Sequence, residues 1–126
     1  MRRRRFILGS RNERRYNVYL FKDKYNLGKP FIYIHPYKQL LAKQVTDRIF
    51  AGISHLLVFG SAVSLACKPY SDLDICVIGD FCESNLSQLR IPGEHLDLIH
   101  YTSADVLMKD RRLYKEIASK GVKIHG

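Results

Sequence analysis

LLVFGSAVSLACKPYSDLDICVIGDF, residues 56–81, is the stretch that decides the fold. Its two apolar runs, LLVF and ICVI, are typical of buried strands, yet the second run is preceded by Asp72 and Asp74. Side chains two apart on a strand point to the same face, so these carboxylates should lie close together. Two neighbouring acids at a buried strand repel each other, and we therefore expect a cation between them.

Mg²⁺ is the simplest candidate, because it takes hard oxygen ligands and is typically held by one or two carboxylates together with substrate phosphates. Phosphates need donors, and Gly60 and Ser61 stand where a strand should turn into a short helix, a place that favours anions. A third acid, Asp97, interrupts the apolar run LDLIH of the next predicted strand. Beside the first two, it would complete a two-metal site or help to deprotonate an acceptor hydroxyl.

An Asp-x-Asp pair before a strand also occurs as a simple turn, and a Gly-Ser pair alone is a weaker signal still. The stronger indication is the ordered set of strand, Gly-Ser, helix, Ser-Asp-x-Asp, strand, loop and a strand that carries an acid. This order predicts a phosphate-handling site rather than a turn.

The remaining chain predicts an α+β domain, with helices packed on a short mixed sheet. Residues 37–50 should form an amphipathic helix, because apolar positions recur there at spacings of three and four. That apolar face comprises Leu40, Leu41, Val45, Ile49 and Phe50. Ser103 is the expected N-cap of a further helix that Gly121 ends, and VKI should form a last strand.

Three segments are expected along the 126 residues. Residues 1–15 are a basic arm, 16–36 a β-hairpin extension and 37–126 the main domain, which carries the three acids. The net charge of +9 is concentrated in the arm, where arginines cluster. Such an arm attracts a polyanion such as nucleic acid, or is simply a solvated terminus.

No apolar run reaches the length of a membrane span, and no secretory h-region follows the first arginines, so a cytoplasmic protein without a membrane partner is expected. The cysteines Cys67, Cys76 and Cys82 are odd in number and lack zinc-ligand spacing. We expect them to be buried free thiols.

The segment GSAVSLACKPYSDLDICV resembles the signature of the DNA polymerase β-like nucleotidyltransferase superfamily, in which Gly-Ser is followed at a short distance by Asp-x-Asp. The chain from 39 to 125 more specifically resembles the minimal nucleotidyltransferase (MNT) domains. In those domains a third carboxylate lies on a later strand, followed by a helix and a Gly-apolar-x-apolar strand. The resemblance implies the nucleotidyltransferase fold.

The resemblance also implies an activity, namely transfer of a nucleoside monophosphate, usually AMP from ATP, to a hydroxyl acceptor. The implied ligands of Mg²⁺, two ions in this reading, are the catalytic residues Asp72, Asp74 and Asp97. The candidate nucleotide-binding residues are Gly60, Ser61, Lys68 and Ser71. Many minimal members have arginines after Gly-Ser that this chain lacks, and Lys68 would supply part of the missing positive charge.

Two functions remain open. As an enzyme, the protein would resemble MNT antitoxins, which add AMP to a tyrosine of a helical HEPN-type toxin. As a catalytically silent module, it would bind RNA or a protein partner through its basic arm. A homodimer or a hetero-complex is expected in either case, because a minimal domain needs a second surface to complete a substrate cleft.

Overall fold

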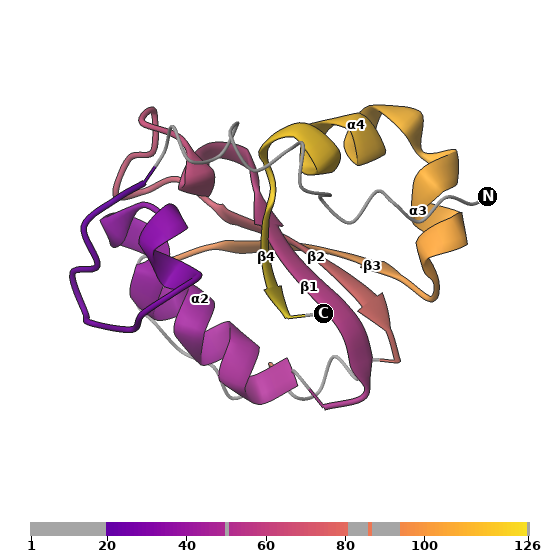
Figure 1. The fold of residues 1–126 in the computed structure, drawn as a ribbon, viewed down its shortest axis with the longest axis horizontal. Helices are drawn as coiled ribbons and strands as arrows, with labels where there is room; N and C mark the ends of the chain where they lie inside the picture. The colour runs from indigo at the N-terminus through magenta and orange to yellow at the C-terminus, as the bar shows by residue number, and fades with distance from the viewer. Residues whose placement is uncertain (1–19, 50, 81–85, 87–93, 126) are drawn as a thin grey trace.

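The structure is a computed structural model that describes residues 20–49, 51–80, 86 and 94–125. It shows an α+β domain with one four-stranded mixed sheet in the order β3-β2-β1-β4 (Figure 1). The strands are β1 (Ile53–Phe59), β2 (Leu73–Gly79), β3 (Leu96–Tyr101) and β4 (Val122–His125). β1 runs antiparallel to both β2 and β4, whereas β2 and β3 are parallel. The predicted α+β class with a short mixed sheet is confirmed.

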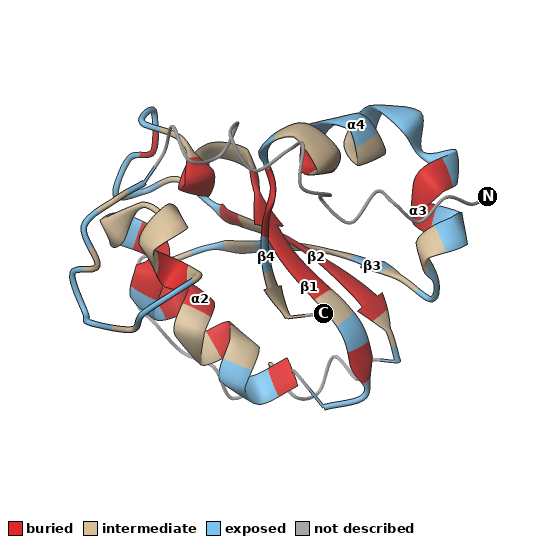
Figure 2. Cartoon of the chain, in the orientation of Figure 1, coloured by how far each residue is buried: buried red, intermediate tan, exposed pale blue. Residues whose placement is uncertain are grey.

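The two central strands are buried on both faces, as Figure 2 shows by the red of β1 and β2. Alternate residues of each strand enter two separate apolar clusters: Leu56 and Val58 pack with helix α2 (Pro36–Ile49), whereas Leu57 and Phe59 pack beneath the C-terminal helices. This alternation follows from the two-residue period of a strand. It explains why LLVF and ICVI are continuous apolar runs.

The predicted helix over 37–50 is present as α2, but its buried face differs from the expected one. Leu41, Val45 and Ile49 are buried as expected, whereas Leu40 is 38% exposed. Lys38 and Gln39 are fully buried instead. The buried face of α2 can include these two polar side chains because they find hydrogen-bond partners inside. Three backbone carbonyls accept hydrogen bonds from Gln39 Nε2.

The expected hairpin over 16–36 is wrong in its second strand, because Phe31–Tyr33 form a 3₁₀ turn, η4. Phe31 and Ile34 are both buried and stand three apart, which is the spacing of a helical turn and not of a strand. Gln39 Nε2 donates to the carbonyls of both residues and fixes this turn against α2. The first strand of the hairpin lies mostly outside the described residues.

The single helix expected after Ser103 is instead two helices, α3 (Ala104–Lys109) and α4 (Arg111–Lys120). Asp110 separates them, because its side chain accepts a hydrogen bond from Leu113 N and caps the start of α4. Ser103 is the N-cap residue of α3, although its side chain makes no capping hydrogen bond. Gly121 ends α4 as predicted.

Several expectations fall outside the described residues: the basic arm 1–15, Phe50 and Cys82. Cys67 and Cys76 are buried free thiols, as predicted. Among the described helices, none combines the length and the apolar character that crossing a bilayer requires.

Candidate functional site

The candidate site lies where β1 ends and β2 and β3 begin. Asp74 is the register partner of Phe59 on one side and of Asp97 on the other. Residues in register on parallel strands point to the same face of the sheet. The sheet therefore brings together two of the three predicted carboxylates, from segments more than twenty positions apart in the sequence.

The carboxyl group of Asp74 lies against the turn that contains Gly60. A Cβ atom placed on Gly60 would collide with Asp74 Oδ2, and the φ angle of Gly60 is +75°. Both observations explain why glycine occupies this position, since only glycine combines free access to positive φ with such a close approach. The predicted glycine and the predicted acid are thus direct neighbours.

The pKa of Asp74 is raised to about 6, first by burial and then by the negative charge of Asp97. The negative charges of Asp72 and Glu116 add to the shift. The shift shows that several acids surround one half-buried carboxylate. A bound cation at this place would relieve that repulsion.

Asp72 lies just before β2 rather than within it, because the strand begins at Leu73. Its Oδ1 lies 3.6 Å from Nδ1 of His95, and its side chain is 55% exposed. The prediction that Asp72 and Asp74 share one strand face is therefore wrong in its premise. Asp72 nevertheless stands near enough for its charge to raise the pKa of Asp74.

The turn after β1 is shorter than expected. Gly60–Val63 form a 3₁₀ turn, η5, that ends at Ser64, where a helix through Cys67 was predicted. The hydrogen bonds from Ser64 N to Ser61 O and from Cys67 N to Ser64 O close successive turns instead. A single turn has little helix dipole, so anion binding at Gly60 and Ser61 depends on individual N–H groups and the Ser61 hydroxyl.

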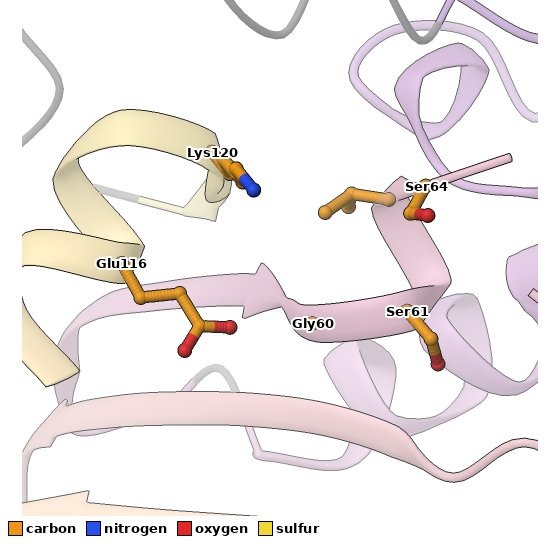
Figure 3. A pocket seen from close by; sticks show the side chains of 6 residues that line it. Gly60, Ser61, Ser64, Glu116 and Lys120 are labelled. Atoms are coloured by element: carbon orange, nitrogen blue, oxygen red, sulfur yellow. The ribbon is translucent and has the colours of Figure 1, made fainter. Parts of the chain in front are cut away.

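A cavity of about 260 Å³ opens beside this turn (Figure 3). Its lining residues come from η5, from the residue after it and from one face of α4: Gly60, Ser61, Val63, Ser64, Glu116 and Lys120. Figure 3 shows Glu116 and Lys120 extending from α4 toward the turn. The cavity thus places one acid and one ammonium group next to the predicted phosphate-binding pair.

The other two candidate nucleotide-binding residues, Lys68 and Ser71, lie in the segment between η5 and β2. Lys68 N donates to Ser71 Oγ at 2.9 Å, and Ser71 N donates to Lys68 O at 3.0 Å. Ser71 therefore closes a turn with its hydroxyl. The side chain of Lys68 is exposed, and Lys68 is not among the residues that line the cavity.

The residues at the site fit a divalent cation in their chemistry. Asp74 and Asp97 offer hard oxygen atoms on adjacent strands, and the raised pKa of Asp74 reports uncompensated negative charge there. The fit is incomplete, since no three His, Cys, Asp or Glu side chains in the described ranges are already arranged to hold a metal ion. Asp74 and Asp97 would be the primary ligands, with Asp72 at the rim.

Three residues of interest were missed from the sequence. Glu116 and Lys120 stand four apart in the sequence, a spacing that puts two side chains on one face of a helix. From this spacing the sequence could have indicated that they act at one place. Lys38 is a fully buried cation that looks like an ordinary solvated lysine in the pattern of α2. For Lys38 the sequence carries no such signal.

Comparisons of this chain with protein-family models, with curated protein sequences and with solved structures found no match.

Proposed function

We propose that this protein is a Mg²⁺-dependent nucleotidyltransferase of the MNT type, which transfers a nucleoside monophosphate, AMP from ATP, to a hydroxyl acceptor. The observation that carries the proposal is the alignment of Asp74 with Asp97 beside Gly60. In the resembling family, the Gly-Ser pair and the carboxylates have to meet at one place. Here residues far apart in the sequence meet in that way, which supports the nucleotidyltransferase fold as part of the proposal.

In the proposed reaction, the acceptor hydroxyl oxygen attacks the α-phosphorus of the nucleotide. A new P–O bond forms, and the bond from the α-phosphorus to the oxygen that bridges to the β-phosphate breaks. The electron pair leaves with pyrophosphate, and Asp97 accepts the hydroxyl proton. Mg²⁺ held by Asp74 and Asp97, with Asp72, would supply neutralisation of the phosphate charge.

The remaining site residues bind and orient the nucleotide. The N–H groups of Gly60 and Ser61 and the Ser61 hydroxyl would donate to phosphate oxygens. Lys120 is the cation that lines the adjoining cavity, so it is better placed than Lys68 to replace the arginines that are missing after Gly-Ser. Glu116 in the same cavity would repel phosphate unless a cation is also bound, which fits the metal dependence of the proposal.

The acceptor class follows from the resemblance. A tyrosine hydroxyl on a helical HEPN-type partner is the acceptor that MNT antitoxins use, and we include it in the proposal. The cavity beside Gly60 and Ser61, of about 260 Å³, is lined by a few residues of one turn and one helix. A partner protein would supply the remaining wall.

Label transfer tests this function. The protein is incubated with Mg²⁺ and each of the four α-³²P-labelled nucleoside triphosphates, alone and with an HEPN-like protein. We expect label on the partner with wild type, loss of label with Asp74→Asn or Asp97→Asn, and no loss with Asp80→Asn, an exposed acid just after β2. Wild-type protein that binds no Mg²⁺-nucleotide and labels no acceptor would refute the enzyme and leave the silent binding module.

A further inference from the structure

Lys38, in the first turn of α2, is the charged side chain that is fully buried in the described part of the chain. A buried ammonium group is costly unless partners compensate it. Lys38 Nζ donates to Glu94 Oε1 at 2.6 Å and to the carbonyl oxygen of Pro69 at 3.1 Å. The side chain of Glu94 is 20% exposed, so this ion pair is largely shielded from water.

The two partners of Lys38 belong to the two segments that deliver the candidate carboxylates. Pro69 precedes Asp72 by three positions, and Glu94 precedes Asp97 by three. One ammonium group thus touches both segments from below the sheet edge. The two hydrogen bonds of Lys38 thus bridge the starts of these segments.

Further contacts join the same two segments nearer the acids. Leu73 N donates to the carbonyl oxygen of His95 at 2.9 Å. Nδ1 of His95 lies 3.6 Å from Asp72 Oδ1, although both side chains are mostly exposed. Of the two side-chain ion pairs between these segments and their neighbours, the buried Lys38–Glu94 pair is therefore the one that solvent weakens less.

The charges of Lys38 and Glu94 also reach the thiol of Cys67, in the segment before β2. Burial raises the pKa of Cys67, the positive charge of Lys38 lowers it, and the negative charge of Glu94 raises it again. Cys67 directly precedes the turn that Lys68 and Ser71 close. The charges of the pair are therefore felt next to that turn.

A buried ion pair contributes little net stability compared with well-packed apolar side chains of the same size. Apolar residues would hold α2 against the sheet equally well, but they would not bind a backbone carbonyl and a carboxylate at fixed positions. This contrast favours a geometric use for the charge.

We propose that Lys38 is a positioning residue of the candidate site, which holds the segments of Asp72 and Asp97 side by side through Pro69 and Glu94. The expected effect on catalysis rests on the proposed function. That Lys38 holds the two segments together rests on its hydrogen bonds alone. Asp74 is held by β1, by Gly60 and by the pairing of β2 with β3, which also keeps Asp97 in register with it. Loss of Lys38 should therefore displace Asp72, which lies before β2, and loosen the start of the β2–β3 pairing next to Asp97.

The test compares Lys38→Met and Glu94→Gln with Lys43→Met, which breaks the exposed Lys43–Asp47 pair on the same helix. Amide hydrogen exchange is measured at Leu73, whose N–H bonds to His95, and at the amides of β1. We expect exchange at Leu73 to rise about tenfold or more in Lys38→Met, with little change in β1 or in the Lys43→Met control. A purely structural role would raise exchange throughout the sheet.

The catalytic readout is a split between kcat and KM in the label-transfer assay. We expect kcat of Lys38→Met to fall at least tenfold, because small displacements of reacting groups are costly, while KM for the nucleotide stays within about twofold. Lys38→Met combined with Glu94→Leu leaves no unpaired buried charge, so it should recover stability without recovering kcat. This double variant also serves if Lys38→Met alone does not fold.

The outcomes separate the two proposals. Unchanged exchange at Leu73 in Lys38→Met and in the double variant overturns the positioning role, whatever the enzyme assay shows. Equal kcat for Lys38→Met and Lys43→Met overturns it as well and leaves the proposed function intact. Selective exchange at Leu73 in a wild-type protein that transfers no label supports the mechanical role and refutes the proposed function.

Discussion

Asp74 and Asp97 stand in register on the parallel strands β2 and β3, and the negative charge of Asp97 raises the pKa of Asp74 after burial. The other charges that raise the pKa of Asp74 are also negative, from Asp72 and Glu116. Acids that gather around one half-buried carboxylate oppose folding, because the repulsion is absent in the extended chain. The arrangement is therefore a cost to stability that a ligand cation would offset.

Replacing Asp74 by asparagine should stabilise the protein at neutral pH. The pKa of Asp74 is raised to about 6 in the folded state, so the folded protein binds the proton more tightly than the unfolded chain. The stability from this proton is present below about pH 4 and is lost as pH rises through about 6. After allowance for solvent exposure, we expect Asp74→Asn to gain about 1 kcal/mol over wild type at pH 7.

Urea unfolding of both proteins from pH 4 to pH 8 measures this difference. The gain should shrink toward zero at pH 4, and Asp80→Asn, on an exposed carboxylate, should show no such trend. If the stability gained by Asp74→Asn did not vary with pH, the raised pKa of Asp74 could not be its origin.

Mg²⁺ should stabilise the wild-type protein, since it binds the folded state and relieves the repulsion around Asp74. At a concentration tenfold above its Kd, a one-site ligand adds about 1.4 kcal/mol. The effect should be smaller at pH 5 than at pH 8, because protons compete for the Asp74 carboxylate. The rise in unfolding temperature is measured in MgCl₂ against NaCl of equal ionic strength. If Mg²⁺ raised it equally in a variant with Asp74→Asn and Asp97→Asn, the ion would bind elsewhere.

Gly60→Ala should destabilise the fold more than Gly28→Ala. Both glycines have positive φ, +75° and +81°, so both substitutions strain the backbone by about 1 to 2 kcal/mol. The new Cβ meets nothing within 4 Å at Gly28 but collides with the Asp74 carboxylate at Gly60. We expect Gly60→Ala to cost about 3 kcal/mol or more in urea unfolding.

The difference in unfolding free energy between the two alanine variants gives the cost of the collision alone, because strain from positive φ is present in both. Removing the carboxylate branch in Gly60→Ala with Asp74→Ala should restore part of the loss. Equal costs for Gly28→Ala and Gly60→Ala would show that the contact between the turn and Asp74 is not tight.

Lys120→Gln should weaken nucleotide use, because Lys120 lines the cavity next to Ser61. Removal of one charge-assisted contact to phosphate typically costs about 1.5 kcal/mol, which is close to a tenfold rise in KM for the triphosphate. Lys68→Gln removes the same charge from an exposed side chain outside the cavity and should change KM by less than about twofold. The reverse order of effects would restore Lys68 as the phosphate-binding cation.

The sheet and the acids on it were predictable from the sequence because they depend on local patterns. Continuous apolar runs indicate strands covered on both faces, and Asp97 is conspicuous within such a run. Their meeting at one edge follows once β2 and β3 are neighbours. The collision of a Gly60 Cβ with Asp74 confirms that the glycine and the acid lie together, which spacing alone could not establish.

The errors share a cause, which is that polar side chains found partners distant in sequence. Lys38 and Gln39 displaced Leu40 from the buried face, because Glu94, Pro69 and several carbonyls accept their hydrogen bonds. Asp110 divided a regular apolar pattern into two helices by capping the second. Periodicity reports which residues are apolar, and it carries no information on which polar residues are satisfied inside.

The division at Asp110 also decides how one side of the cavity is supported. α4 is bounded by the Asp110 cap and by Gly121, and Ile117 is its fully buried residue. α4 packs against α3, β1 and η5. Leu113, Tyr114 and Ile117 of α4 lie in one apolar cluster with Leu107 and Met108 of α3. The side of the cavity that Glu116 and Lys120 line is therefore tied to the sheet through apolar packing that both helices share, and a substitution in either helix should shift both side chains.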